Sequence, residues 1–123
     1  MNMADIDDKV HALEFSTMTT KSRVQVRQHL DDAAQVSQGQ KITLSDSTDD
    51  LVQGIARNFV RFQHAAFTFA FKADASGATS VEFRITDYLR TRDMLFYFIP
   101  MSPWSAPAYK TLKEFSEYVR TGL

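Results

Sequence analysis

The segment FTFAFKADASGATSVEFRITDYLRTRDMLFYFIPMSPW, residues 67–104, decides the fold class of this chain. Within it, apolar and polar side chains alternate over Phe67–Phe71 and again over Val81–Ile85. An alternation with a period of two is typical of a strand that buries one face and leaves the other in water. The turn residues Asp74–Gly77 separate these two strands, and Met94–Ile99 supplies a third apolar run. We therefore expect an antiparallel sheet at the centre of the structure.

Four other segments have the spacing of amphipathic helices. In each, apolar residues recur every three or four positions, and residues that commonly cap helices stand near several of the ends. The expected helices cover residues 5–15, 23–38, 49–64 and 106–121, and the expected strands cover residues 41–44, 66–73, 79–87 and 93–99. The fold class that follows is α+β, a single layer domain with helices packed on an antiparallel sheet of about three to four strands.

The helix expected at 49–64 rests on the spacing of its large apolar residues. Positions three and four apart on one helical face carry Leu51, Ile55, Phe59 and Phe62. A long strand over Phe59–Lys72 is the alternative interpretation. The helix is preferred because it gives Arg57 and Arg61 a common solvent-facing side, although Gly54 in its interior lowers its intrinsic stability.

Length and composition indicate one folded domain. With 123 residues, 44% of them hydrophobic, and only four Gly and three Pro, the chain can bury one real core and lacks a disordered composition. Residues 18–123 are expected to form this domain. Residues 1–17 are interpreted as a peripheral N-terminal extension, because the run MTTK at residues 18–21 resembles a translation start.

Cysteine usage and hydropathy set the expected compartment. The chain has no cysteine, no apolar leader segment, and no apolar run as long as the ~20 residues that cross a bilayer. We therefore expect a cytoplasmic protein without disulfides and without a membrane partner. Charge is divided unevenly, because residues 1–50 carry five Lys/Arg against nine Asp/Glu, whereas residues 51–123 carry nine against six. A basic second part is compatible with an anionic partner.

The sequence contains no motif for catalysis or for a bound cofactor. Its three histidines lie on separate expected helices and are His11, His29 and His64. Only His11 with Glu14 has the spacing of a metal-ligand pair, and nucleophile motifs and Gly-rich phosphate loops are absent. The acids that flank the sheet, and that are candidates for acid–base catalysis, are Glu82, Asp87 and Asp93. Each is explained more simply as a solvated strand or turn residue, so we expect no metal, no cofactor and a role other than catalysis.

Basic and aromatic residues gather in the second and third strands and just beyond them. The candidate binding residues are Arg84, Arg90, Arg92, Tyr97 and Trp104. Proteins that bind single-stranded nucleic acid stack bases on exposed aromatic rings and hold phosphates with Arg or Lys. The RNP motif of such proteins is absent, and the alternation over Phe67–Phe71 is explained more simply as core. Binding of single-stranded nucleic acid is therefore an alternative function.

The third expected strand, residues 93–99, is apolar on both faces. One face carries Met94, Phe96 and Phe98, and the other carries Leu95, Tyr97 and Ile99. A strand that is apolar on both faces needs cover on both. A second subunit on the second face would contribute about 1.5–3 kcal/mol for each large side chain that it buries. Leu95, Tyr97 and Ile99 are therefore the candidates for self-association as a homodimer.

Three functions follow from these observations. The leading hypothesis is a small soluble binding or interaction domain, without a catalytic site, that self-associates through its sheet. The second is single-stranded nucleic-acid binding through the Arg and aromatic residues named above. The third is a small-molecule or lipid pocket, with catalysis left open, between the helix expected at 49–64 and the sheet.

Overall fold

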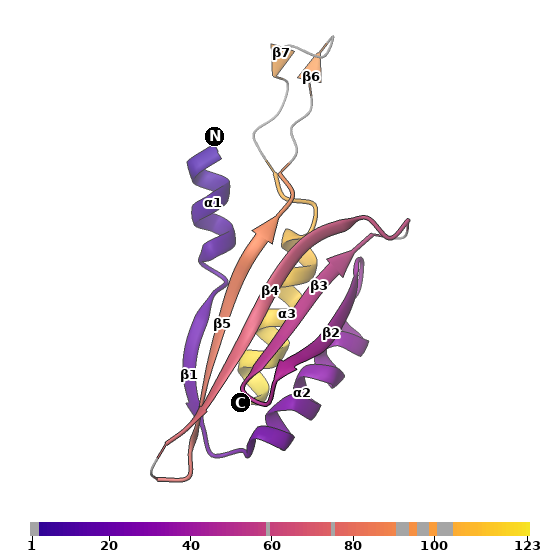
Figure 1. Ribbon diagram of the computed structural model, residues 1–123. Helices are drawn as coiled ribbons and strands as arrows, with labels where there is room; N and C mark the ends of the chain where they lie inside the picture. Colours follow the sequence, from indigo (N-terminus) through magenta and orange to yellow (C-terminus); the bar gives the residue numbers. More distant parts are fainter. Residues whose placement is uncertain (1–2, 59, 75, 91–93, 96–98, 101–104) are drawn as a thin grey trace.

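A computed structural model describes residues 3–58, 60–74, 76–90, 94–95, 99–100 and 105–123. In chain order its elements are α1 (Met3–His11), β1 (Phe15–Thr19), α2 (Arg23–Val36), β2 (Lys41–Thr48), β3 (Leu51–Arg57), β4 (Gln63–Ala73), β5 (Thr79–Tyr88), β6 (Met94–Leu95), β7 (Ile99–Pro100) and α3 (Tyr109–Gly122). Helices α2 and α3 lie on one side of a twisted sheet, and α1 lies beside the end of β5 (Figure 1). The α+β class is confirmed, and the main sheet has five strands, slightly more than expected.

The five strands of the main sheet are antiparallel and follow the order β1-β5-β4-β3-β2. Strands β2 to β5 form a meander in which each strand pairs with the next one along the chain. β1 joins the far side, where Phe15 lies opposite Phe83 of β5. The edges of the sheet are therefore β1 and β2, and β2, with eight residues, is the longer edge.

The core lies between the sheet and the helices α2 and α3. The inward rings of Phe67, Phe69 and Phe83 are buried and meet one another. Phe67 and Phe69 also meet the ring of Phe115 in α3. The rings of Phe69 and Phe83 are stacked with centroids 4.8 Å apart, and such a pair contributes about 0.5–1.5 kcal/mol beyond its buried area. The interpretation of the Phe67–Phe71 alternation as core is confirmed.

The C-terminal end of α3 is bound by side chains of α2 and of the residues just before it. His29 Nε2 lies 3.2 Å from the carbonyl oxygen of Tyr118 and 3.1 Å from that of Val119, and Lys21 Nζ donates to the carbonyl oxygen of Gly122. The last carbonyls of a helix have no partner inside it, so these side chains supply one. A Cβ atom at Gly122 would lie 2.1 Å from the His29 ring, and glycine therefore permits this close contact.

The helix expected at 49–64 is wrong, because its first half is the strand β3. Leu51 and Ile55 are four positions apart, which fits one helical face. Four is also an even number, so the same two residues share one face of a strand. In β3 they are only half-buried, whereas Val52 and Ala56 on the opposite face are buried in the core. The spacing alone could not separate the two structures.

Gly54 decides in favour of the strand. It lies opposite Phe67 of β4, and a Cβ atom at Gly54 would come within 2.1 Å of that ring. Glycine in a strand often marks such a close approach of a neighbouring group. The small-molecule or lipid pocket was expected between a helix at 49–64 and the sheet. Residues 51–57 form a strand of that sheet, so the helix that would form one wall of the pocket is not there.

The prediction that residues 93–99 form a third strand of the main sheet is wrong. Met94–Leu95 and Ile99–Pro100 pair only with each other, in a separate two-stranded sheet, and residues 93 and 96–98 lie outside the described part of the chain. The place beside β5 belongs instead to β1, a strand that was not expected from the sequence. The polar FSTMT sequence hides its alternation, because its inward positions include Thr17 and the buried Thr19.

The other expected elements are present with shifted ends. The helices expected at 5–15, 23–38 and 106–121 are α1, α2 and α3, and the strands expected at 41–44, 66–73 and 79–87 are β2, β4 and β5. β2 extends to Thr48, and α1 ends at His11. The division of the chain at residue 17 stays a prediction, although α1 buries Ile6 and Val10.

Candidate functional site

The structure describes two of the five candidate binding residues, Arg84 and Arg90. Arg84 lies on the exposed face of β5, with its Nε 3.0 Å from Oε1 of Glu82. Arg90 follows β5 and contacts α1 through Asp7. The two arginines therefore have different acidic partners. The remaining candidates lie outside the described residues and are Arg92, Tyr97 and Trp104.

The sheet face around Arg84 offers no aromatic platform in its described central part. Arg84 lies opposite Thr68, and the outward neighbours of Thr68 along β4 are Ala66 and Ala70. Stacking of bases requires an exposed ring, which these side chains do not provide. Nucleic-acid binding at Arg84 stays a prediction that depends on rings outside this area.

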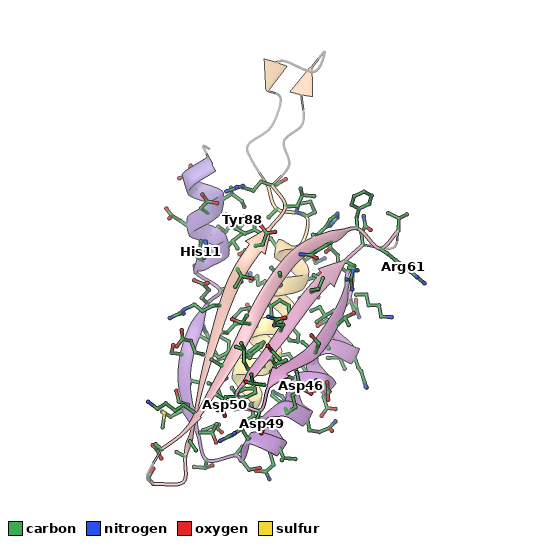
Figure 2. The ribbon with its side chains drawn as sticks, viewed as in Figure 1. His11, Asp46, Asp49, Asp50, Arg61 and Tyr88 are labelled. Carbon is green, nitrogen blue, oxygen red and sulfur yellow. The ribbon has the colours of Figure 1, made fainter. Side chains whose placement is uncertain are left out.

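Arg90 belongs to a cluster that fastens α1 to the end of β5. Asp7 accepts a hydrogen bond from the Tyr88 hydroxyl and another from Arg90 Nη1 at 2.9 Å. The Arg90 guanidinium also lies 5.3 Å from the centre of the Tyr88 ring. Figure 2 shows Tyr88 beside α1, where the ring of His11 meets it edge-on. These contacts give Arg90 a structural role in the α1–β5 junction.

The acids considered for catalysis and the metal-ligand pair have ordinary surroundings. Glu82 pairs with Arg84, Asp87 is exposed, and Asp93 lies outside the described residues. Glu14 accepts from the backbone nitrogen of Ile85 at 2.8 Å and lies 3.1 Å from His11 Nδ1. Within the described ranges no three His, Asp or Glu side chains form a group that could hold a metal. The side chains of Leu95 and Ile99 lie outside the description as well.

A groove runs along α2, between that helix and the edge strand β2. It consists of two adjoining cavities of about 590 and 850 Å³, both of which have Gln28 and Asp31 in their walls. The first cavity lies toward the start of α2 and reaches the β2–β3 turn. The second lies toward the end of α2 and follows residues 41–44 of β2. We call the whole depression the α2–β2 groove.

The first cavity combines apolar and acidic side chains. The buried Val52 and Phe71 contribute to its lining, and Val24 of α2, 79% exposed, stands at its rim. Asp46 lines it from the last part of β2, and Asp49 lines it from the β2–β3 turn, next to the start of α2 (Figure 2). An apolar surface bordered by carboxylates suits a side chain that has an aliphatic stem and a cationic head.

The arginines of this cavity are already ion-paired. Arg27 has one nitrogen 2.5 Å from Asp31 and another 2.7 Å from Asp46. Partial burial lowers the pKa of the Arg27 guanidinium, but the hydrogen bonds and negative charges of Asp46 and Asp31 outweigh it and raise that pKa above its ordinary value. Arg23 lies 2.5 Å from Asp50. These cations are therefore not free to bind an incoming anion.

Asp49 is the acid of the first cavity that lies outside these ion pairs. It is exposed, and it forms no ion pair with any residue in the described ranges. A Lys or Arg side chain that entered the cavity could place its charged nitrogen near Asp49.

The second cavity is rich in side-chain amides. Gln28, Gln35 and Gln40 line it. Gln40 also contacts Nδ1 of His64, whose Nε2 accepts from Asn58 Nδ2 at 3.3 Å. Because a neutral imidazole has one donor and one acceptor nitrogen, Nδ1 must carry the proton. The Gln40 oxygen, which is otherwise buried without a partner among the described residues, is then the group that should face Nδ1.

The backbone of β2 forms one wall of the groove. β2 pairs with β3 on one side, and in the described structure no strand pairs with its other side. Every second residue of an edge strand turns its N–H and C=O groups away from the sheet, where they can pair with another chain. A bulge between Asp46 and Thr48 interrupts the regular register at one end. The regular part, Lys41–Ser45, lies beside the second cavity.

This groove was not predicted from the sequence. Its walls are two elements that were expected independently of each other, the helix at 23–38 and the strand at 41–44. One signal was present, since Val24 stands apart from the buried face of α2 formed by Val26, Leu30 and Ala33. An apolar residue outside the core-facing stripe of a helix can indicate a second contact surface.

Comparison with known proteins adds no assignment. No protein-family model, no curated protein and no solved structure matches this chain.

Proposed function

We propose that this protein is a binding domain that holds an extended segment of a partner polypeptide in the α2–β2 groove. The observation that carries the proposal is the position of β2, an edge strand with one side unpaired among the described residues, beside a groove that follows α2. A binding or interaction role was also expected from the sequence. The proposed site, however, is the α2–β2 groove and not the surface of Leu95, Tyr97 and Ile99.

Strand addition provides the affinity in this proposal. An extended segment laid along Lys41–Ser45 forms backbone hydrogen bonds with the outward groups of β2 and becomes a sixth strand of the sheet. Its alternate side chains point toward α2, where Gln28 and Gln35 offer donors and acceptors. Backbone pairing is independent of sequence, so the specificity must come from the side chains.

A basic residue in the partner provides the specificity. Its aliphatic stem lies on Val24, Val52 and Phe71 in the first cavity, and its cationic head approaches Asp49. Arg23 and Arg27 do not repel this head strongly, because Asp31, Asp46 and Asp50 neutralise them. We therefore expect the groove to prefer lysine or arginine over acidic residues.

Two short peptides of alternating residues test the proposal, one of lysine and valine and one of glutamate and valine. Amide chemical shifts of the labelled protein should change in β2 and α2 with the lysine peptide and stay unchanged with the glutamate peptide. Methylation of alternate backbone nitrogens in the lysine peptide should abolish binding if strand pairing is required. Equal shifts with both peptides, or shifts confined to other elements, would contradict the proposal.

A pair of charge reversals isolates the role of Asp49. Asp49→Lys should weaken binding of the lysine peptide about five- to tenfold, since it replaces attraction by repulsion in the first cavity. Glu114→Lys is the matched control, because Glu114 is exposed on α3 and does not line either cavity. An equal loss in both variants would indicate a general charge effect and exclude the specific contact.

Light scattering distinguishes a partner polypeptide from a second copy of this chain. The proposal expects a mass near the 14.0 kDa of one chain in the absence of peptide. Twice that mass, lost in Leu44→Glu, would assign the groove to a second copy and overturn the partner. Twice that mass, lost in Leu95→Glu but not in Leu44→Glu, would favour the self-association surface expected from the sequence.

A further inference from the structure

The loop between β3 and β4 exposes apolar side chains at one end of the sheet. Val60 is 57% exposed and Phe62 is 71% exposed. Phe62 is more exposed than any other large hydrophobic residue of the described sheet and its loops. Exposed apolar residues at a loop tip do not contribute to the core, and their exposure to water is unfavourable.

The backbone of this loop is fixed by Asn58. Its Oδ1 accepts hydrogen bonds from the backbone nitrogens of Val60 at 3.1 Å and Phe62 at 2.8 Å. The backbone nitrogen of Asn58 donates to the Phe62 carbonyl at 3.0 Å, and that of Arg61 donates to the Asn58 carbonyl at 2.9 Å. Both apolar residues are therefore held in place on the loop rather than collapsed onto the sheet.

Arg61 adopts a backbone conformation that is unfavourable for its residue type. Its φ of 67° lies in the left-handed region, and it is the one described residue other than glycine with a positive φ. Such a conformation is unfavourable for a residue with a Cβ atom and persists where surrounding contacts enforce it. Strain at an exposed, hydrogen-bonded loop supports a functional role for the geometry that it maintains.

Three cations lie in this loop or at the adjoining strand ends. Arg57 ends β3 and lies opposite Lys41 of β2, and Arg61 stands in the loop itself. Residues 51–73 contain no Asp or Glu. Figure 2 shows Arg61 at the opposite end of the sheet from the acidic β2–β3 turn. The β3–β4 loop and the adjoining ends of β2 and β3 therefore combine exposed apolar groups with positive charge and suit an anionic surface.

We propose that the β3–β4 loop binds the surface of an anionic lipid bilayer. Val60 and Phe62 enter the headgroup region, and Lys41, Arg57 and Arg61 contact lipid phosphates and other anionic headgroup oxygens. A nucleic acid fits this loop less well, because proteins that bind single strands use a charged groove. The β3–β4 loop instead projects from the end of the sheet (Figure 1).

Binding at a bilayer surface differs from the expectation that there is no membrane partner, which stays a prediction. In the described part of the chain no helix is long and apolar enough to cross a membrane. Binding at the bilayer surface requires no such helix, because a few apolar side chains and cations reach only the headgroup region.

Sedimentation with lipid vesicles tests the proposal. Vesicles of phosphatidylcholine mixed with phosphatidylserine should bind the protein, and vesicles of phosphatidylcholine alone should bind it at least tenfold more weakly, since about three cations contribute. Phe62→Ser should reduce binding to the anionic vesicles about tenfold. Arg61→Asn, which suits the left-handed backbone, should reduce it about fivefold.

Matched controls separate loop binding from other causes. Val36→Ser removes an apolar side chain that is 53% exposed on α2 and should leave lipid binding unchanged. Asp49→Lys, which is expected to weaken peptide binding in the α2–β2 groove, should not weaken lipid binding either. Circular dichroism melts verify that each variant folds. Equal binding to both vesicle types, no binding to either, or displacement from anionic vesicles by single-stranded DNA that depends on Phe62 would overturn the proposal.

Discussion

The two ends of β3 differ in charge and in the contacts of their charged side chains. Two arginines and four aspartates lie around its start and come from α2, the last part of β2 and the β2–β3 turn: Arg23, Arg27, Asp31, Asp46, Asp49 and Asp50. Most of these charges are joined in ion pairs. Around its end are Lys41, Arg57 and Arg61, which form no ion pair within the described residues. The acidic end thus stabilises the contact between α2 and β2, whereas the basic end holds a strained loop whose apolar residues face water. The variants below test this contrast.

The largest effect is expected from Gly54→Val, which alters the strand shared by both ends. The new side chain would collide with the Phe67 ring, which already occupies the space of a Cβ atom at this position. Overpacking of this kind should reduce the free energy of unfolding by about 3 kcal/mol or more. Chemical denaturation measures it. Gln53→Val, at the exposed neighbouring position, is the control and should change stability by less than about 0.5 kcal/mol.

Asn58→Ala should disturb the basic end and leave the acidic end unchanged. It removes the acceptor of two backbone hydrogen bonds in the loop, at a cost of about 1–2 kcal/mol. Hydrogen exchange should speed up at the amides of Val60 and Phe62 and remain unchanged in α2. Asn58→Asp keeps an acceptor oxygen and should lose less. Unchanged exchange in Asn58→Ala would show that the loop geometry does not depend on this side chain.

Arg27→Met and Arg61→Met compare the same change at the two ends. At the acidic end the change leaves Asp31 and Asp46 without their cation, and we expect a loss of about 1 kcal/mol that decreases at high salt. At the basic end no described ion pair is lost, so the change should stay within about 0.5 kcal/mol. Equal losses measured by urea denaturation would contradict the difference between the ends.

The smallest effect is expected at the β4–β5 turn, which lies at the same end of the sheet as the acidic turn (Figure 1). Asp74 accepts hydrogen bonds from the hydroxyl and backbone nitrogen of Ser76 and from the nitrogen of Ala78, and these lower the pKa of its carboxyl below the ordinary 3.8. A lowered pKa in the folded state means that the carboxylate stabilises the fold above pH 3.8 and loses this effect as the pH falls through the folded-state value. Asp74→Asn should therefore be slightly less stable than the original chain at neutral pH.

Thermal melts at several pH values measure this difference. The gap between Asp74→Asn and the original chain should narrow below pH 3.8. A gap that stays constant down to the lowest pH at which both chains fold would mean that the charge of the carboxylate does not stabilise the turn.

Local patterns allowed the central strands to be predicted, and non-local contacts decided the rest. The alternation over Phe67–Phe71 and Val81–Ile85 fits a strand and does not fit a helix, and both segments are strands. The spacing of Leu51 and Ile55 fits both a helix and a strand, and the contact of Gly54 with Phe67, thirteen positions away, separates them. Such a contact becomes visible only when the strands are paired.

The candidate sites likewise depend on contacts between residues that are far apart in the sequence. Charge and aromatic content pointed to Arg84 and Arg90, but their partners Glu82 and Asp7 come from the folded arrangement. The α2–β2 groove depends on the distance between two elements, which no residue spacing records. The absence of acids from residues 51–73 was readable in the sequence, yet it gained meaning only when Val60 and Phe62 were found exposed.

The order of strands in the sheet has a consequence for how the chain folds. The meander β2–β5 spans residues 41–88 and needs only short turns, so its contacts can form early. β1 pairs with β5 across a separation of 68 residues, from Phe15 to Phe83, and pays the entropy of closing that loop. We therefore expect the strand β1 to dock last, after the phenylalanine core of the meander has assembled and made a stable edge for it.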